Sequence, residues 1–246
     1  MSNHHIVQQD CLEYLSSLPD ESVDMVLTDP PYFIGFDGGK GWDKQWKSEQ
    51  EYLDWCEKWT HECVRVLKDN RMLIVWGTLK TDTFLKYKLL LSDIEELHPQ
   101  NEIIWSYNWG GRSKKNFARK HEYAWVYSKG DSFIFNDKDI RIPRKVKKNL
   151  RTGEEYAEGT IPTSVWEKNN HTTSKDFIGW HPTTKNVEVL SRMILAYTNP
   201  GETVLDIFMG SGSTAVAALR NGRNVKGCEA DAEYYEKLLK RVDETV

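Results

Sequence analysis

The chain has 246 residues and a formal net charge of −4, a length that fits one principal α/β domain with an elaboration. No stretch reaches the roughly eighteen apolar residues that span a membrane, and the N-terminus lacks the basic and apolar regions of a signal peptide, so we expect a cytoplasmic protein. The four cysteines form no Cys-x-x-Cys pair, which argues against a disulfide framework and a zinc ribbon, and we expect no bound metal.

Hydrophobic periodicity predicts strands and helices that alternate along the chain. In chain order the predicted elements are strand 6–9, helix 11–18, strand 23–27, helix 48–67, strand 72–76, helix 81–91, strands 102–107 and 122–128, helix 187–197, strand 203–206, helix 213–220, strand 224–228 and helix 232–242. Residues from about 131 to 180 have little sustained periodicity and are predicted to form an insertion or small subdomain. The alternation implies an α/β fold, with a mostly parallel sheet covered on both faces.

Positive charge is concentrated in one part of the chain. The segment 110–151 contains thirteen Lys and Arg residues against four acidic ones, and the rest of the chain carries a net charge of −13. Tyr107, Phe117 and Trp125 are among the aromatic residues interleaved with these cations, a combination that suits phosphate neutralisation and base stacking. A solvated loop is the alternative. The candidate nucleic-acid contacts are Arg112, Lys114, Lys115, Arg119, Lys120, Arg144, Lys145, Lys147 and Lys148.

A glycine-containing loop lies between the predicted strand 203–206 and the predicted helix 213–220. The sequence of this loop is Asp206-Ile207-Phe208-Met209-Gly210-Ser211-Gly212, and Glu229 ends the next strand. Glycine lets the backbone approach a ligand closely, and a carboxylate can accept both hydrogen bonds of a ribose diol. No lysine follows Gly212, which excludes a P-loop, whereas Ala215 fits the looser form of a nicotinamide or flavin motif. The loop favours a nucleoside without phosphates, and a tight turn without a ligand is the alternative.

The motif Asp29-Pro30-Pro31-Tyr32 follows the predicted strand 23–27, at the end where parallel sheets bind ligands. An exocyclic base amine is a poor nucleophile because its lone pair is delocalised into the ring. If Asp29 and the Pro30 carbonyl accept the two amine hydrogens, the nitrogen becomes more tetrahedral and its lone pair can face an electrophilic methyl group. The prolines hold the loop rigid, and Tyr32 can stack on a base taken out of a duplex. A surface turn is the alternative.

Together these motifs resemble the amino-methyltransferases that modify DNA bases, and the resemblance spans nearly the whole chain. Asp-Pro-Pro-Tyr precedes the glycine loop, which is the permuted order of the beta class. Further matches are Asp10-Cys11-Leu12, His121-Glu122-Tyr123 and His181-Pro182-Thr183-Thr184-Lys185. The resemblance implies a Rossmann-like S-adenosylmethionine-dependent methyltransferase sheet with a small basic target-recognition insertion. It divides the chain into a catalytic half at 1–106, a basic target-recognition region at 107–180 and a cofactor-binding half at 181–246.

The resemblance also implies roles for individual residues. Those that would hold the target base are Asp29, Pro30, Pro31 and Tyr32. Those that would bind the cofactor are Asp10, Asp29, Lys185, Asp206, Phe208, Gly210, Gly212 and Glu229. In this scheme Glu229 would take the ribose hydroxyls, Lys185 would pair with the cofactor's carboxylate, and Phe208 with the two glycines would cradle the methionine moiety. Asp10 would lie beside the adenine ring or its amine, and an N-cap of the helix that begins at Cys11 is an equally good role for it.

The implied reaction is methyl transfer to an exocyclic amine of a base flipped out of duplex DNA. Asp29 favours N6 of adenine, because Ser is frequent at the first motif position in enzymes that modify N4 of cytosine. The alternatives are an N4-cytosine enzyme, an RNA or protein-amide methyltransferase, and a non-catalytic DNA-binding module. The resemblance is compatible with a homodimer and with a prokaryotic or phage-encoded enzyme, for example of restriction-modification.

Overall fold

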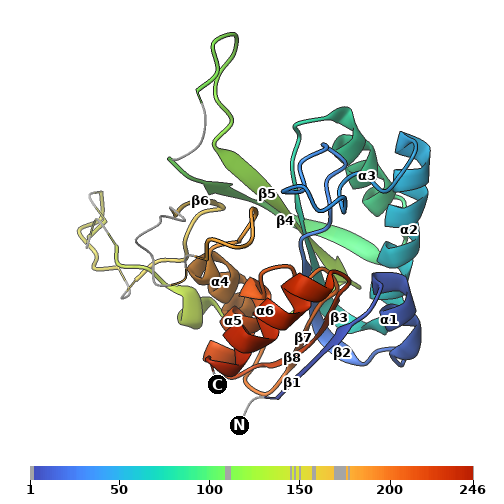
Figure 1. Ribbon diagram of the computed structural model, residues 1–246. Helices are drawn as coiled ribbons and strands as arrows, with labels where there is room; N and C mark the ends of the chain where they lie inside the picture. Colours follow the sequence, from blue (N-terminus) through green and yellow to red (C-terminus); the bar gives the residue numbers. More distant parts are fainter. Residues whose placement is uncertain are drawn as a thin grey trace.

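The computed structural model describes residues 3–108, 112–144, 146, 148–149, 151–156, 159–168, 176 and 178–245. Within these ranges eight strands form one sheet in the order β1-β8-β7-β2-β3-β5-β4-β6 (Figure 1). The strands are β1 His4–Gln8, β2 Val23–Thr28, β3 Leu67–Gly77, β4 Leu97–Ser106, β5 His121–Lys129, β6 Val165–Glu167, β7 Thr203–Asp206 and β8 Asn224–Glu229. The helices are α1 Cys11–Ser17, α2 Glu49–Val66, α3 Asp82–Ser92, α4 Val187–Tyr197, α5 Ser213–Arg220 and α6 Ala232–Asp243, with a 3-10 turn η1 at Asp137–Ile140.

Helices cover both faces of the sheet, with α1, α2 and α3 on one face and α4, α5 and α6 on the other (Figure 1). Successive residues of the central strand β2 face opposite ways. Met25 and Leu27 belong to the core under α4–α6, whereas Val26 belongs to the core under α1–α3. Because helices cover both faces of the sheet, every residue of β2 is buried. The predicted α/β fold with helices on both faces is confirmed, and every helix in the described ranges is too short or too polar to cross a bilayer.

The sheet is mixed in strand direction. β1, β8, β7, β2 and β3 are parallel to one another, and β4 is parallel to β6. Among the described strands, β5 is antiparallel to both of its neighbours, β3 and β4. The described residues between β4 and β5 contain no helix, and the two strands pair as a hairpin, whereas a parallel neighbour requires a crossover connection. The expectation of a mostly parallel sheet therefore holds away from this hairpin.

Side chains at the helix starts bond the N–H groups of the first turn. Ser48 Oγ accepts from Glu51 N at 3.1 Å and caps α2. Asp10 Oδ1 accepts from Leu12 N at 2.8 Å and caps α1, so the capping alternative for Asp10 is confirmed. Asp231 caps α6 in the same way. Asp10 and Asp231 therefore start their helices close to the ends of β1 and β8.

β4 and β6 differ from the sequence-based expectation. β4 begins at Leu97, five residues earlier than expected, and includes Pro99. The register with β5 shifts between Pro99 and Asn101, an irregularity at which the missing proline N–H is tolerated. β6 has no predicted counterpart, because three residues in a polar segment produce no periodicity. Its buried Trp166 pairs with Trp105 of β4, so this part of the segment 131–180 extends the main sheet.

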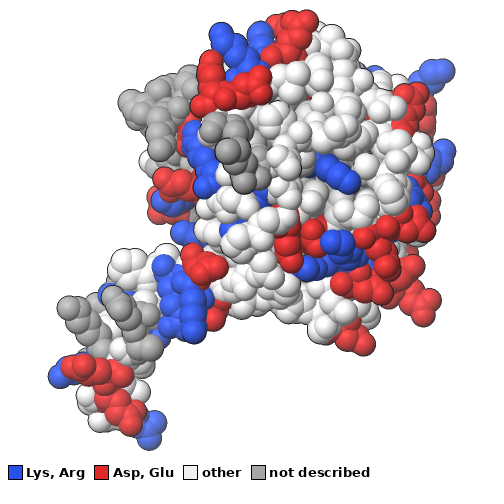
Figure 2. Space-filling view, turned by 90° about the horizontal axis from the view of Figure 1, so that it is seen from below, with Lys and Arg blue, Asp and Glu red and all other residues white. Residues whose placement is uncertain are grey.

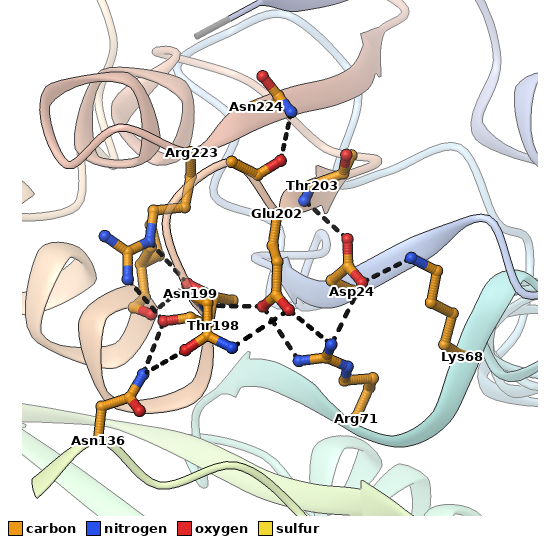
Figure 3. A network of polar contacts seen from close by, with 12 residues as sticks. Asp24, Lys68, Arg71, Asn136, Thr198, Asn199, Glu202, Thr203, Arg223 and Asn224 are labelled. Carbon is orange, nitrogen blue, oxygen red and sulfur yellow. Dashed lines mark hydrogen bonds and ion pairs between the residues drawn. The ribbon is translucent and has the colours of Figure 1, made fainter.

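At the edge where β2 and β7 begin, a polar network connects three neighbouring strands (Figure 3). Arg71 of β3 makes two hydrogen bonds to the Glu202 carboxylate, at 2.6 and 3.0 Å. The same guanidinium lies 3.5 Å from Asp24 Oδ1. Asp24 is buried and also accepts from Thr203 N at 2.9 Å and from Lys68 Nζ at 2.7 Å. One guanidinium thus bridges two carboxylates from different parts of the chain.

Two segments project from the body of the protein. Residues 112–120, between β4 and β5, extend beyond the sheet at the top of Figure 1, and the segment around 141–156 extends to the left. Seen from below, this second projection carries Lys and Arg close to Asp and Glu (Figure 2). Both projections belong to the basic part of the chain.

Candidate active site

A cavity of about 180 Å³ opens where β1, β2, β7 and β8 end, the edge at which parallel sheets bind ligands. All four residues of the first motif line it, namely Asp29, Pro30, Pro31 and Tyr32. Seven of the eight residues expected to bind the cofactor also line it, namely Asp10, Asp29, Lys185, Asp206, Phe208, Gly210 and Glu229. The two motifs meet because β2 pairs directly with β7.

The glycine loop turns from β7 into α5 through two glycines in the left-handed region, Gly210 with φ 48° and Gly212 with φ 74°. A Cβ atom at Gly210 would lie 2.8 Å from His181 Nε2, on the wall of the cavity. A Cβ atom at Gly212 would instead lie 3.3 Å from Leu238 Cβ of α6. Gly212 does not line the cavity; it is the N-cap of α5. Gly212 is therefore required by the turn and by the close packing of α6, whereas Gly210 is required by the close approach of His181 in the cavity wall.

Two carboxylates at neighbouring strand ends hold this loop in place. Glu229 Oε2 accepts from Gly210 N at 2.7 Å, and its Oε1 accepts from Asp231 N at 2.9 Å. Asp206 Oδ1 accepts from Thr28 Oγ1 at 2.7 Å, which links the end of β7 to the end of β2. Burial raises the pKa of Asp206 to about 6 and also raises the pKa of Glu229. A carboxylate has about four acceptor positions, so Glu229 keeps capacity for hydroxyl groups of a ligand.

Asp29 belongs to a cluster of charged and phenolic groups. The Tyr32 hydroxyl donates to Asp29 Oδ1, and the Lys185 ammonium donates to Asp29 Oδ2. Lys185 Nζ also lies 3.1 Å from Glu122 Oε2, near the start of β5. Burial alone lowers the pKa of Lys185, but the carboxylates of Asp29 and Glu122 outweigh it and hold that pKa above its ordinary value. Since the ammonium already faces these two carboxylates, its pairing with the cofactor's carboxylate stays a prediction.

The motif around Tyr32 is held from both sides. The Tyr32 ring packs edge-on against Phe84 of α3, with 4.8 Å between ring centroids. Burial and the charge of Asp29 hold the pKa of Tyr32 well above its ordinary value, so its hydroxyl stays protonated and acts as a donor. The Tyr52 hydroxyl of α2 donates to the Pro31 carbonyl at 2.7 Å. These contacts keep the motif in one conformation at the cavity.

Asp43 organises the loop that follows the motif and was not apparent from the sequence. This buried carboxylate accepts from three backbone N–H groups, those of Phe33 at 2.6 Å, Ile34 at 2.8 Å and Phe36 at 3.1 Å. Ile34, Phe36 and Asp43 all line the cavity. A single aspartate in an unpatterned loop has no spacing that distinguishes it from a solvated one.

The cavity is acidic and partly aromatic. Its described lining contains one ammonium group, that of Lys185, and five carboxylates, those of Asp10, Asp29, Asp43, Asp206 and Glu229. His181 is neutral near pH 7, because burial, Lys185 and Arg241 lower its pKa to about 4. Trp55 lies beside Phe208 on the wall, with 5.4 Å between ring centroids. Such a lining fits a cationic nucleoside such as S-adenosylmethionine, and it argues against a dinucleotide, whose phosphates need cations.

The loop 112–120 presents basic and aromatic side chains to solvent. Its exposed cations are Arg112, Lys114, Lys115 and Arg119. Phe117 is 98% exposed, and Lys120 Nζ donates to the Asn108 carbonyl at 2.8 Å. The two strands at its base pair through Trp105 and Glu122. The loop therefore starts beside the Asp29 cluster.

Two cations in the described part of the second projection make local contacts. Arg144 Nε donates to the Gly159 carbonyl at 2.7 Å, and its guanidinium lies 4.5 Å from the centre of the Tyr156 ring. Lys148 Nζ lies 3.5 Å from Glu155 Oε1. Lys145 and Lys147, two further candidate nucleic-acid contacts, lie outside the residues that the structure describes.

Comparison with known proteins agrees with this geometry. A family profile of DNA methylases, of the N6/N4 methyltransferase type, matches residues 23–240. The chain is 32% identical to the DNA adenine methyltransferase YhdJ of Escherichia coli strain K12 over 249 residues, which cover 97% of this chain and 82% of that protein.

Two solved structures share the fold. The PvuII DNA methyltransferase, described as cytosine-N4-specific, has a TM-score of 0.77 at 19% identity and covers 100% of this chain and 92% of that one. The complex of M1.HpyAVI with SAM has a TM-score of 0.62 at 22% identity and covers 97% of this chain and 99% of that one. The Rossmann-like methyltransferase fold predicted from the motifs is confirmed. Because the profile extends over most of its length, the chain belongs to the DNA methylase family of N6/N4 amino-methyltransferases.

Proposed function

We propose that this protein transfers a methyl group from S-adenosylmethionine to N6 of adenine in duplex DNA. One observation carries the proposal: the Asp29 carboxylate and the glycine loop line a single acidic cavity at the ends of adjacent strands. Carboxylates suit a cationic methyl donor, and Asp29 beside it suits an amine with two hydrogens to donate. The name of the E. coli relative, a DNA adenine methyltransferase, supports adenine as the target.

In this proposal Asp29 and the Pro30 carbonyl accept the two amine hydrogens and turn the nitrogen lone pair toward the donor. S-adenosylmethionine, when bound, supplies a methyl group on a cationic sulfur. The amine nitrogen would bond to that carbon while the carbon–sulfur electron pair stays on sulfur, and Asp29 would take up one N–H proton. Tyr32 would stack on the flipped base and donate its own hydroxyl hydrogen to Asp29.

The cofactor would be held by the remaining wall of the cavity. Glu229 would accept from the ribose hydroxyls, and Asp10 would lie toward the adenine ring. Phe208 and Gly210 would line the methionine moiety, with Asp206 supporting their loop from beneath. Lys185 keeps its proposed pairing with the cofactor's carboxylate only if its ammonium serves the cofactor and Asp29 together.

N4 of cytosine is the second candidate target, because it is the same kind of exocyclic amine and the fold relative with the higher TM-score is described as cytosine-N4-specific. Methylation-sensitive sequencing of DNA from cells that express the protein decides between the two. We expect N6-methyladenine at a defined sequence. N4-methylcytosine would replace the adenine assignment, and unmodified DNA from cells with folded protein would contradict a DNA substrate.

Replacing Gly210 with alanine is expected to weaken S-adenosylmethionine binding about tenfold, measured by isothermal titration calorimetry. The new Cβ would lie 2.8 Å from His181 Nε2, so the loop or the imidazole must move within the cavity wall. Gly222→Ala is the matched control, because Gly222 also has a left-handed φ of 73° but a Cβ there would meet nothing within 4 Å. Equal affinities of the two variants would move the cofactor site elsewhere.

We also propose that the loop 112–120 and the second projection face the DNA, as a target-recognition region at 107–180 between the catalytic half 1–106 and the cofactor-binding half 181–246. The supporting observation is that the loop starts at the Asp29 cluster, which would place bound phosphates near the flipped base. The resemblance extends this proposal to a cytoplasmic location and a homodimer, and sedimentation velocity tests the latter.

Replacing Arg112, Lys114, Lys115 and Arg119 together with glutamine is expected to weaken DNA binding and flatten its salt dependence. Each phosphate contact contributes about 0.9 to the slope of log affinity against log salt, so four lost contacts remove up to ~3.6. Fluorescence anisotropy at several salt concentrations measures this slope. The matched control replaces four exposed lysines around α2 and α3, namely Lys47, Lys58, Lys80 and Lys86. The same slope in both variants would remove the loop from the DNA-facing surface.

A further inference from the structure

Glu122 has no role in the reaction described so far, yet its carboxylate reaches the Asp29 cluster. Its side chain is 21% exposed, but its Oε2 atom is buried. That oxygen lies 3.1 Å from Lys185 Nζ, and no other described group contacts it with hydrogen-bond geometry. A buried carboxylate is costly unless it is paired, so the position of Glu122 calls for a physical reason.

Asp29 and Glu122 share the positive charge of Lys185. Its ammonium donates to Asp29 Oδ2 and at the same time faces Glu122. A lysine that faced Asp29 alone would neutralise it and occupy an oxygen that the target amine needs. The second carboxylate competes with Asp29 for the ammonium, and the three charged groups together carry a net charge of about −1. A net negative cluster stabilises the positive charge that develops on the amine nitrogen during transfer.

We propose that Glu122 is a positioning residue for methyl transfer: it acts through Lys185 to keep the Asp29 carboxylate available as an acceptor for the target amine. The proposal rests on the role of Asp29 in the proposed function. Glu122 supports the chemistry without holding DNA or cofactor, so its loss lowers the rate of transfer and leaves both affinities close to those of the parent.

The ionisation of Glu122 makes this role dependent on pH. The titratable and charged groups that act on it are Asp29, Tyr32, Tyr107, His121 and Lys185. Burial raises the pKa of Glu122, Lys185 lowers it and Asp29 raises it again, with a net increase. As pH falls through this raised pKa, Glu122 takes up a proton and stops attracting Lys185. The parent enzyme should therefore lose rate at a higher pH than the ordinary glutamate pKa of about 4.3 would imply.

Glu122→Gln tests the proposal in single-turnover methyl transfer from tritiated S-adenosylmethionine, on a duplex that contains the sequence found by sequencing. At neutral pH the rate is expected to fall on the order of tenfold, with less than a ~2-fold change in DNA or cofactor affinity. The acid-side decline of the rate should begin at a lower pH than in the parent. Glu102→Gln is the matched control. Glu102 belongs to the neighbouring strand β4, its carboxylate also pairs with a lysine, Lys88, and it lies outside the cavity. This variant should match the parent.

Three results would overturn the proposal: a parental rate in Glu122→Gln, a reduced rate whose acid-side decline begins at the parental pH, or tenfold losses of affinity. Glu122→Asp keeps the negative charge. It should restore part of the methyl-transfer rate and the acid-side decline of that rate at the parental pH. If Glu122→Gln is too unstable to assay, the absence of that decline from Glu122→Asp contradicts the proposal. Asp29→Ala, assayed in parallel, separates the two hypotheses: activity there contradicts the proposed function, whereas an inactive Asp29→Ala with a parental Glu122→Gln contradicts the role of Glu122 alone.

Discussion

Replacing Asp29 with alanine is expected to lower the single-turnover rate of methyl transfer by about a thousandfold. The variant has no carboxylate to accept the amine hydrogens, so the lone pair of the nitrogen stays delocalised in the base. DNA affinity should change little, because the proposed phosphate contacts of the basic projections would supply most of it. Tritium transfer measures the rate, and fluorescence anisotropy measures the affinity.

The fold should persist in Asp29→Ala, because Lys185 keeps Glu122 as a carboxylate partner. A thermal melt and a cofactor titration check this. Asp54→Ala serves as the control, since it removes an exposed carboxylate of α2 outside the cavity. A near-parental rate in Asp29→Ala would refute the catalytic assignment of the motif.

The second large effect concerns stability: replacing Arg71 with methionine is expected to lower the free energy of unfolding by about 3 kcal/mol. Methionine retains an apolar stem but removes the guanidinium that bridges Asp24 and Glu202 (Figure 3). The side chains of these acids are only 8% and 17% exposed, so both charges would lose a partner with limited access to water. Urea unfolding measures the change.

Lys86→Met is the comparison for this stability measurement. Lys86 pairs with Glu49, and their side chains are 50% and 38% exposed, so the loss should stay below about 1 kcal/mol. Similar losses in the two variants would mean that the bridge at Arg71 contributes no more than a surface ion pair.

The sequence predicted best those elements whose limits are marked by local chemistry. The helices α4 and α5 and the strand β7 have the predicted bounds, because a turn at Asn199-Pro200-Gly201, a glycine loop and a closing Asn221-Gly222 separate them. The meeting of the two motifs was predictable as well, since both follow parallel strands and such strands end at one edge. β6 could not be predicted, because its strand state depends on pairing with β4.

The parts of the site that escaped prediction depend on contacts between distant segments. Glu122 reaches Lys185 only because β5 lies between β3 and β4, an order that periodicity does not reveal. Asp43 is a cavity residue because three N–H groups of its own loop converge on it. Gly212 belongs to the glycine motif, yet its neighbour is Leu238 of α6. Motif membership predicted which residues gather, and only packing shows which of them face the cavity.

The edge strand β1 has β8 as its neighbour in the described sheet; Asp10 follows β1, and Glu229 is the last residue of β8. One side of the cavity is therefore translated long before the other. A nascent chain on the ribosome presents the Asp-Pro-Pro-Tyr loop long before β7 and β8 have been made, and at that stage β1 lacks β8, its partner in the described sheet. If Glu229 takes the ribose hydroxyls as proposed, binding of the methyl donor awaits translation past residue 229, and a polypeptide that a stop codon ends before β7 would modify no DNA.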